Sequence, residues 1–430
     1  MKPRREGSPP RIVVFSHVFP NQAQPTFGIF VRERMFRVAA HLPLVVVAPV
    51  PWFPGQSVVR RWWPHYRPAV PAYEEQHGVA VYHPRYLCLP GLFKGLDGLF
   101  MALGALGSMH RLQREGGIDL IDAHFVYPDG VAAWLIARWL RRPYTITLRG
   151  TIVRISRTLG RRWQASRALR GAARVFSVAD SLRQVGLGMI AGPQASRSGG
   201  DCAGLSAPVR GADPEQAIEV LANGVNLEFF HPEDRWSCRQ QLGLPAEVPV
   251  IITVGTLNER KGFHRVIEQL PALIEQEPQL CYLAVGGASP DGNDEQRLRQ
   301  LAGELGVTEH VYFTGAIPPE QLRYYYSAAD LFVLPSRFEG WANVFLEAAA
   351  CGLPCVATDV GGNAEVIGDP GVGRLVPFGD GQELRQTILQ ALRHPWDHQA
   401  ILAYARANSW AERIPRLVAQ LRAAASQSHT

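Results

Sequence analysis

Residues 336–367 read SRFEGWANVFLEAAACGLPCVATDVGGNAEVI, which combines a loop, a short helix, a buried strand and a Gly-Gly turn. Two carboxylates of this stretch, Glu339 and Glu347, stand eight positions apart. Eight helical positions span about 12 Å, so a glutamate before the helix and one within it would hold opposite ends of one extended ligand. The alternative is a loop acid and a solvated helix acid that share no ligand. The order of elements indicates one unit of an α/β domain.

The same order repeats through the second half of the chain. Short apolar runs are typical of strands in a parallel sheet, and segments with helical periodicity separate them. The predicted strands are residues 250–254, 280–285, 311–314, 331–335 and 355–358. The predicted helices are residues 264–276, 295–305, 319–328 and 343–351. This alternation predicts a doubly wound parallel sheet.

The first half of the chain alternates in the same way. Its predicted strands are residues 11–15, 44–48, 118–123, 144–148, 173–178 and 219–221. Its predicted helices are residues 29–41, 95–113, 130–140 and 165–171. A second doubly wound sheet follows from this pattern.

The chain therefore predicts two doubly wound, Rossmann-like α/β domains that enclose a cleft between their facing edges. We place the N-terminal domain at residues 1–232 and the C-terminal domain at residues 233–409. Residues 410–430 form a last helix with no strand after it, and we expect this helix to cross back onto the first domain. Residues 189–214 are rich in Gly, Ser, Ala and Pro, which predicts a flexible surface loop.

Length and composition are ordinary for a soluble two-domain protein. The chain has 430 residues, of which 47% are hydrophobic and 19% are charged. Its six cysteines lack metal-type spacing, and Cys351 and Cys355 lie in apolar sequence, which predicts buried thiols and a reducing compartment. The basic start lacks the apolar core of a signal peptide, and no run reaches the roughly 18 apolar residues that span a bilayer. We expect a cytoplasmic protein without a metal site.

Charge is distributed unevenly along the chain. Residues 1–222 carry 28 Lys/Arg and 14 Asp/Glu, a formal charge of +14, whereas residues 223–430 carry a formal charge of −8. Residues 130–179 contain eleven arginines and no acidic residue. This asymmetry predicts an anionic partner for the first half, but no recognisable nucleic-acid-binding module accompanies it, so nucleic acid is not expected.

One segment of the first half indicates what that partner is. Residues 50–73 are rich in Pro, Trp and Arg, a combination that suits the interface of an anionic membrane. The alternative is a loop that packs over the domain with its aromatic side chains inside. The first interpretation places the protein peripherally on the inner face of the cytoplasmic membrane.

Two basic residues follow the predicted strand at residues 250–254. Arg260 and Lys261 come after Gly255 and Thr256 and stand at the start of a predicted helix. Two cations beside a helix N-terminus form a cradle for a diphosphate. The spacing differs from that of a Walker A loop, and no Ser or Thr follows the lysine. The alternative is an exposed basic cap without a ligand.

The two glutamates fit the remaining parts of a nucleotide sugar. Glu347 is placed to accept the hydroxyl groups of a ribose, as acidic residues do in dinucleotide-binding folds. Glu339 is placed to bind the hydroxyl groups of a sugar. A nucleotide diphosphate sugar would then lie along the second domain, with its phosphates at Lys261.

Three residues of the first domain stand where open α/β sheets bind ligands, after the carboxyl ends of strands. Gly28 begins a predicted helix and allows close backbone approach to an anion. His124 and Arg149 each come directly after a predicted strand. The alternatives are a glycine that only turns the chain and polar residues that only end their strands.

Motifs spread over nearly the whole chain resemble the retaining glycosyltransferases of family four, which have the GT-B fold. The most specific is the stretch at residues 336–367, in which spacing and local identity agree over some thirty residues. The others are FPNQAQPTFGIFVRERM, DAHFVYPDGVAAWL, TLRGT, LANGVNLEFFHP, VGTLNERKG and VYFTGAIPPEQL.

The resemblance implies a role for each residue of the donor site. It places Lys261 on the donor diphosphate, Glu339 on the donor sugar and Glu347 on the ribose. It places the backbone at Asn343 and Val344 on the phosphates. The loop that contains Gly28 faces the phosphates from the first domain. Gly255, Thr256 and Arg260 of the second domain complete the expected donor-binding set.

The resemblance also implies the chemistry. The acceptor attacks the front face of the sugar, the donor phosphate helps to take its proton, and no covalent nucleophile is needed. Positive side chains and helix dipoles replace a metal ion, and no cofactor is expected. The residues expected to carry catalysis are Glu339, Lys261, Arg149 and His124. The reaction moves a sugar from a nucleotide diphosphate sugar to a glycan or lipid-linked acceptor in cell-surface polysaccharide biosynthesis.

The sequence departs from the family pattern at three positions. Thr256 stands where many members have arginine, and either Arg260 supplies that charge or Arg149 reaches across the cleft. Arg149-Gly150 replaces a common His-Gly, and Ile152 replaces an aspartate. A subgroup that resembles teichuronic acid enzymes also has Arg-Gly-Thr.

Two other functions fit the same architecture. A sugar-nucleotide 2-epimerase needs acid and base carboxylates in the first domain, and only Asp122 and Asp129 lie near His124 in sequence. A non-catalytic sugar-nucleotide-binding protein would tolerate the substitutions at Thr256 and Ile152.

Overall fold

The computed structural model describes residues 8–63, 66–191, 218–288 and 292–427. The chain forms two compact units, one of Met1–Asn223 with Arg413–Thr430 and one of Gly224–Glu412. The unit boundary lies nine residues before the expected boundary after residue 232, because Val225 and Phe230 are buried in the apolar core of the second unit. The last helix, α17 (Trp410–Ala425), contributes its residues from Arg413 onward to the first unit.

The first unit contains an eight-stranded sheet in the order β10-β9-β8-β7-β1-β2-β5-β4. All its neighbouring strands are parallel except β4 and β5, and a second parallel sheet joins β3 to β6. The central strands β1, β7 and β8 are fully buried, as expected for a sheet that is covered on both faces. The strands are β1 (Ile12–Phe15), β2 (Leu44–Val47), β3 (Val50–Trp52), β4 (Tyr73–Gln76), β5 (Val79–Tyr82), β6 (Arg85–Leu87), β7 (Leu120–His124), β8 (Tyr144–Leu148), β9 (Arg174–Ser177) and β10 (Ile218–Val220).

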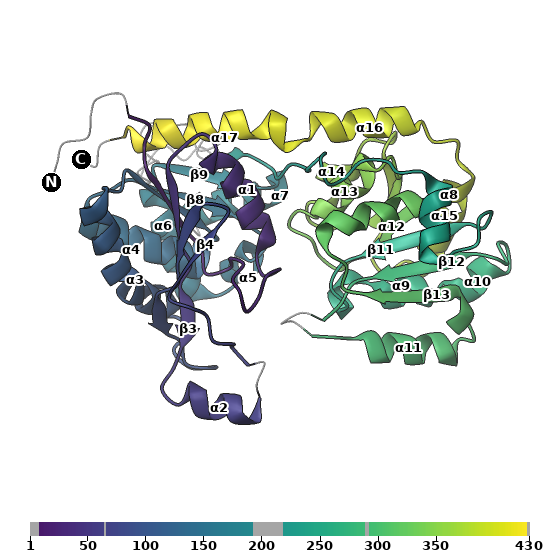
Figure 1. Cartoon of the computed structure of the whole chain (residues 1–430), viewed down its shortest axis with the longest axis horizontal. Helices are drawn as coiled ribbons and strands as arrows, with labels where there is room; N and C mark the ends of the chain where they lie inside the picture. Colours follow the sequence, from purple (N-terminus) through teal and green to yellow (C-terminus); the bar gives the residue numbers. More distant parts are fainter. Residues whose placement is uncertain (1–7, 64–65, 192–217, 289–291, 428–430) are drawn as a thin grey trace, which may run out of the picture. The chain divides into compact units, whose positions relative to one another are not determined.

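Helices cover both faces of this sheet. The connection from β1 to β2 runs one way across the sheet and that from β7 to β8 runs the other way, so right-handed crossovers put α1 and α4 on opposite faces. Figure 1 shows these two helices on opposite sides of the strands. Besides α17, the described helices of this unit are α1 (Ile29–Ala39), α2 (Gln56–Trp62), α3 (Asp97–Glu115), a π-helical turn (Val126–Gly130), α4 (Val131–Leu140), α5 (Ile152–Ser156), α6 (Leu159–Gly171) and α7 (Asp180–Ala191).

Two segments of this unit for which no strand or helix is predicted contain regular elements in their described parts. Residues 50–73 contain β3 and α2, which the low periodicity of the segment does not reveal. Of the expected flexible loop at residues 189–214, the first three residues belong to α7, and residues 192–214 lie outside the described residues.

The second unit contains a six-stranded, fully parallel sheet in the order β13-β12-β11-β14-β15-β16. Its strands are β11 (Val250–Val254), β12 (Cys281–Val285), β13 (Val311–Gly315), β14 (Leu331–Leu334), β15 (Cys355–Thr358) and β16 (Gly373–Val376). Cys351, at the end of α13, and Cys355, in β15, are buried free thiols, which confirms the prediction from their apolar surroundings. In the part of the chain that the structure describes, no helix is long and apolar enough to span a bilayer.

Helices surround the second sheet as well. The predicted helix at residues 264–276 is two helices, because Pro271 lacks the amide that would continue the first one. The 3₁₀ turns are Glu259–Lys261, Thr308–His310 and Pro319–Gln321. The α-helices are α8 (Arg235–Leu242), α9 (Phe263–Ile267), α10 (Leu270–Ile274), α11 (Glu295–Glu304), α12 (Leu322–Ala328), α13 (Asn343–Ala350), α14 (Asn363–Ile367), α15 (Gly381–Arg393) and α16 (His398–Ala407).

Both sheets reverse their strand order at one point, and ligands of such sheets bind beside that point, after the carboxyl ends of the strands. In the second unit the reversal lies between β11 and β14. In the first unit it lies between β1 and β7. We refer to these two places as the second-unit edge and the first-unit edge.

Candidate functional site

The second-unit edge holds a cluster of two cations around one carboxylate. Lys261 Nζ lies 2.7 Å from Glu339 Oε1, and Arg260 Nη1 lies 3.0 Å from the same oxygen. The lysine and glutamate side chains are only 12% and 7% exposed, whereas that of Arg260 is 42% exposed. The structure therefore brings together three of the residues predicted from sequence. Arg260 and Lys261 contact the same oxygen of Glu339, so Arg260 is near enough to supply the charge of the arginine that Thr256 replaces.

The turn that carries the cations is fixed by local polar contacts. Asn258 caps the 3₁₀ turn, since its side-chain oxygen accepts a hydrogen bond from the Lys261 amide at 3.2 Å. The amide group of Asn258 in turn donates to Thr256 Oγ1 at 2.9 Å. Thr256 thus supports the turn through Asn258. A Cβ at Gly255 would lie 3.3 Å from the Lys261 side chain, so this glycine leaves room for the lysine.

The Gly-Gly pair of the opening stretch fixes the loop of Glu339. Gly361 has a φ of +56°, and a Cβ there would lie 1.9 Å from the Glu339 carbonyl oxygen. The Gly362 amide donates to that same oxygen at 3.0 Å. This close backbone approach explains why glycine is required at the end of the motif.

The second glutamate lies on α13. Tyr326 Oη donates to Glu347 Oε2 at 3.0 Å. Burial raises the pKa of Glu347 to about 7, although the Tyr326 hydrogen bond and the charge of Lys261 act in the opposite direction. Asn343 and Val344 form the first turn of the same helix, and no side chain caps that turn. Backbone N–H groups of this turn are directed out of the helix, as an anion requires.

In the first unit, Gly28 precedes α1 in the left-handed conformation, with a φ of +76°. A Cβ at this position would lie 2.5 Å from the Val18 carbonyl oxygen. The glycine is therefore required for the loop after β1 to pack against the start of α1.

His124 and Arg149 meet at the first-unit edge. Arg149 Nη2 lies 3.2 Å from His124 Nδ1, and His124 Nε2 lies 3.3 Å from Asp122 Oδ2. Burial lowers the pKa of His124, which keeps the imidazole neutral, and burial also lowers the pKa of Arg149. Ile152, which replaces the aspartate expected from the resemblance, is fully buried.

A second histidine pair lies at the same edge and was not predicted from sequence. His17 follows β1, and its Nδ1 lies 2.7 Å from Oδ2 of the buried Asp129. Burial acts to lower the pKa of His17, but the Asp129 carboxylate outweighs it and raises that pKa above its ordinary value. The position of His17 directly after the first strand is the signal that could have identified it.

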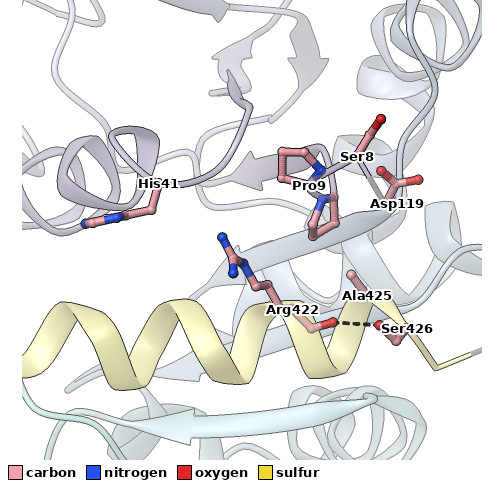
Figure 2. A pocket seen from close by; sticks show the side chains of 8 residues that line it. Ser8, Pro9, His41, Asp119, Arg422, Ala425 and Ser426 are labelled. Carbon is pink, nitrogen blue, oxygen red and sulfur yellow. Dashed lines mark hydrogen bonds between the residues drawn. The ribbon is translucent and has the colours of Figure 1, made fainter. Parts of the chain in front are cut away.

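The pocket in Figure 2 lies away from both edges. It has a volume of about 580 Å³, and it is lined by residues that precede β1 and β7 and by the end of α17. Figure 2 shows the Arg422 side chain pointing into the space between His41 and Pro9. Because Pro9 and Asp119 precede their strands, this pocket is at the amino ends of the parallel strands and does not include the predicted site residues.

Comparison with known proteins supplies the family. The family model described as "Glycosyl transferases group 1" matches residues 234–408. D-inositol 3-phosphate glycosyltransferase 2 of Catenulispora acidiphila is 30% identical over 76% of this chain and 75% of its own length. The chain belongs to the glycosyl transferases group 1 family.

Two further comparisons describe this group 1 glycosyltransferase. A Bacillus subtilis protein that carries the name teichuronic acid biosynthesis glycosyltransferase TuaC is 29% identical over 83% of each chain. The structure of sucrose-phosphate synthase from Thermosynechococcus elongatus superposes with a TM-score of 0.73 at 22% identity, over 97% of this chain and 100% of that chain. The structural likeness confirms the GT-B fold expected from the motifs.

Proposed function

We propose that this group 1 glycosyltransferase is a retaining, metal-independent enzyme that uses a nucleotide diphosphate sugar as donor. Its acceptor is a glycan or lipid-linked sugar of cell-surface polysaccharide biosynthesis. The observation that carries the proposal is the cluster of Lys261, Arg260 and Glu339 at the second-unit edge, beside a helix that also presents Glu347. The name of the Bacillus subtilis relative supports the cell-surface role.

The proposed roles of Lys261, Arg260 and Glu339 follow from competition between the donor diphosphate and Glu339 for the two cations. A diphosphate carries more negative charge than one carboxylate, so it competes with Glu339 for Lys261 and Arg260. Once the cations bind the phosphates, the Glu339 carboxylate is free to accept hydrogen bonds from the donor sugar. The first turn of α13, at Asn343 and Val344, adds backbone N–H donors to the phosphates.

Glu347 completes the donor site at the ribose. An ionised carboxylate accepts hydrogen bonds from both ribose hydroxyls, and Tyr326 holds one of its oxygens in place. The donor diphosphate, once stabilised by Lys261 and Arg260, leaves from the sugar and takes the acceptor proton. The cations supply the charge that a metal ion supplies in other transferases, so activity is expected to persist in excess EDTA.

We also propose that the first unit docks on an anionic membrane at the cytoplasmic face. Trp62 and Trp63, at the end of α2, are 78% and 68% exposed, and Phe93 is 62% exposed. Arg67 connects α2 to the segment at Cys88, because its carbonyl oxygen accepts a hydrogen bond from Arg60 Nε at 2.8 Å and its own Nη1 donates to the Cys88 carbonyl oxygen at 2.8 Å. Exposed aromatic residues among arginines suit a lipid interface.

Sedimentation with vesicles tests the membrane proposal. Binding to phosphatidylglycerol vesicles is expected, with weaker binding to phosphatidylcholine vesicles and a further loss at high salt. Trp62→Ala with Trp63→Ala should reduce binding at least about tenfold, since each buried aromatic contributes on the order of 1.5–3 kcal/mol. Trp236→Ala, at an exposed tryptophan of the second unit, is the matched control. Equal binding of both variants would remove the membrane proposal and leave the enzyme proposal intact.

Donor turnover with and without a membrane extract as acceptor tests the reaction. The proposal predicts slow donor hydrolysis alone and faster consumption with acceptor, with retention of the anomeric configuration in the product. Recovery of an epimerised nucleotide sugar would identify an isomerase instead. Donor binding without turnover would identify a sugar-nucleotide-binding protein.

A further inference from the structure

The first-unit edge contains a buried cation that forms no ion pair with a carboxylate of the described part of that unit. Arg149 is 5% exposed, and its guanidinium lies 4.7 Å from the ring centroid of Phe30 and 5.9 Å from that of Phe125. Its Nε forms no hydrogen bond with any described residue. A buried charge without a paired oxygen anion is costly, so a native structure that keeps one has a use for it.

Neighbouring residues hold this guanidinium in a fixed orientation. Arginine only donates hydrogen bonds, so His124 Nδ1 accepts from Arg149 and the imidazole proton resides on Nε2. His124 Nε2 faces Asp122 Oδ2 at 3.3 Å, and Asp122 Oδ1 accepts from Thr145 Oγ1 at 2.7 Å. The neutral imidazole therefore holds the Arg149 guanidinium in place by a hydrogen bond and does not compensate its positive charge.

The charges of this cluster do not balance. Arg34 is 1% exposed and donates to the Leu221 carbonyl oxygen at 2.7 Å, which carries no formal charge. Burial lowers the pKa of Arg34 to about 10, so it stays charged at neutral pH. The charge of Asp122 acts on both guanidinium groups without an ion pair to either among the described residues, and the other carboxylate of this edge, Asp129, pairs with His17. Arg34, Arg149 and Asp122 together therefore carry one excess positive charge.

We propose that Arg149 binds an acidic group of the substrate, either the carboxylate of an acidic sugar or a phosphate of the acceptor. The inference rests on the proposed function, because the acidic group belongs to one of its two substrates. Both sources present oxygen anions that match the planar fork of a guanidinium. Thr151 stands two residues after Arg149, and its buried hydroxyl also has no hydrogen-bond partner among the described residues, which provides a further donor on the same turn.

Matched substrates with and without the acidic group test this inference. One arm compares UDP-glucuronate with UDP-glucose, and GDP-mannuronate with GDP-mannose, as donors. The other arm compares a lipid-linked acceptor extract before and after phosphatase treatment. In one arm the wild type should prefer the acidic member by about 10- to 100-fold in kcat/KM. This ratio corresponds to the free energy that a hydrogen bond to a charged group contributes. The responding arm identifies whether the carboxylate or the phosphate is bound.

Substitution of Arg149 provides the decisive contrast. Arg149→Met should abolish the difference between the two members of the responding pair, and Arg149→Lys should retain part of it because lysine keeps the charge but lacks the fork. Arg154→Met, at an exposed arginine five positions later, should retain the full preference.

Thermal unfolding separates this role from a structural one. Without substrate, Arg149→Met should melt at or above the wild-type temperature, since a similar-sized apolar side chain replaces an unneutralised buried charge. A lower melting temperature together with an unchanged substrate preference would show a structural arginine and overturn the inference. If the wild type turns over both members of every pair equally, the inference fails and the proposed function stands. If it binds no nucleotide sugar, both fail.

Discussion

The two edges of this glycosyltransferase differ in whether their buried cations have a carboxylate partner among the described residues. At the second-unit edge, Lys261 and Arg260 both pair with Glu339, so their charges are compensated before any ligand arrives. At the first-unit edge, Arg149 rests on a neutral histidine and two aromatic rings. Under the proposed function, a donor diphosphate would displace a carboxylate at the second-unit edge, whereas the proposed acidic group would bind a cation without a carboxylate partner in the described part of the first unit.

This difference has consequences for stability as well as for binding. Removing one partner of a compensated buried pair leaves the other charge exposed to the low-dielectric interior, which destabilises the fold. Removing a buried charge that has no partner takes away a penalty. The same kind of substitution should therefore have opposite effects on stability at the two edges, and each variant below tests one part of that contrast.

The largest expected effect is that of Lys261→Ala. Turnover should fall about 10²- to 10³-fold, because in the proposed mechanism the lysine stabilises the leaving diphosphate. The variant should also unfold more readily, since among the described residues it leaves the 7% exposed Glu339 with the half-exposed Arg260 as its one charged partner. Steady-state kinetics and thermal unfolding measure both effects.

Lys94→Ala is the control for that prediction. Lys94 pairs with Asp97 in the first unit, and its loss should leave turnover of a soluble acceptor unchanged. If Lys261→Ala kept turnover within a few-fold of the wild type, the phosphate role of Lys261 would be wrong. If it lost turnover but gained stability, the contrast between the two edges would be wrong.

Glu347→Gln should change the pH dependence of both the free energy of unfolding and the donor affinity, in opposite directions. Burial raises the pKa of Glu347 to about 7 in the folded state, above its ordinary value near 4.5. The folded state then holds its proton more tightly, so stability falls as pH rises from about 4.5 to 7, by about 3 kcal/mol over the full window. The glutamine variant should lose this contribution to the pH dependence, and it should unfold at higher denaturant concentration than the wild type at pH 8.

Donor affinity should change in the opposite direction. In the proposed donor site the ionised carboxylate accepts both ribose hydroxyls, so wild-type donor affinity should improve as pH rises through about 7, and Glu347→Gln should remove that improvement. Denaturant unfolding and donor titrations at pH 5 and pH 8 provide both readouts. Parallel pH profiles for the wild type and the variant would contradict the ribose assignment.

Gly361→Ala tests the backbone approach that positions Glu339. The φ of +56° and the 1.9 Å approach of a Cβ to the Glu339 carbonyl oxygen should cost about 2 kcal/mol and shift the Glu339 loop. Gly379→Ala is the matched control, because Gly379 also has a positive φ but no atom lies within 4 Å of its Cβ position. A rise in donor KM for Gly361→Ala alone would link the glycine to the site. Equal changes in donor KM and stability for both variants would mean that Gly361 only forms a turn and does not position Glu339.

The second-unit edge could be predicted closely from sequence. Glu339 and Glu347 lie in one short stretch of sequence and the Lys261 turn lies in another. Each stretch directly follows a predicted strand, which indicates that both lie at the same edge of the sheet. What the sequence could not provide is the direct pairing of Lys261 with Glu339, which joins residues 78 positions apart.

The first-unit edge was predicted less well. His124 and Arg149 were identified as residues after strands, but the bond between them depends on the pairing of β7 with β8. The His17–Asp129 pair was missed because it depends on the neighbouring strands β1 and β7. Long-range pairing carries little local signal, so charge compensation at an edge can be determined only from the folded chain.

Tyr326→Phe should have the smallest effect and is the finest test of the second-unit edge. The phenol donates to Glu347 Oε2 at 3.0 Å, and Tyr326 is itself fully buried. Its loss removes a bond that favours the ionised carboxylate, so the pKa of Glu347 should rise further above about 7. At pH 7 the donor KM should rise about two- to tenfold, in line with about 0.5–1.5 kcal/mol for one hydrogen bond.

The pH dependence distinguishes this role from a loss of packing. If Tyr326 acts through the ionisation of Glu347, the defect in donor KM should shrink at pH 9, where the carboxylate is ionised in both proteins. Tyr325→Phe, at the neighbouring and less buried tyrosine, should show no defect at either pH. A defect of equal size at pH 7 and pH 9 would mean that Tyr326 only supports the packing of α12 against α13. In that case, the charge state of Glu347 would depend on burial and Lys261 alone.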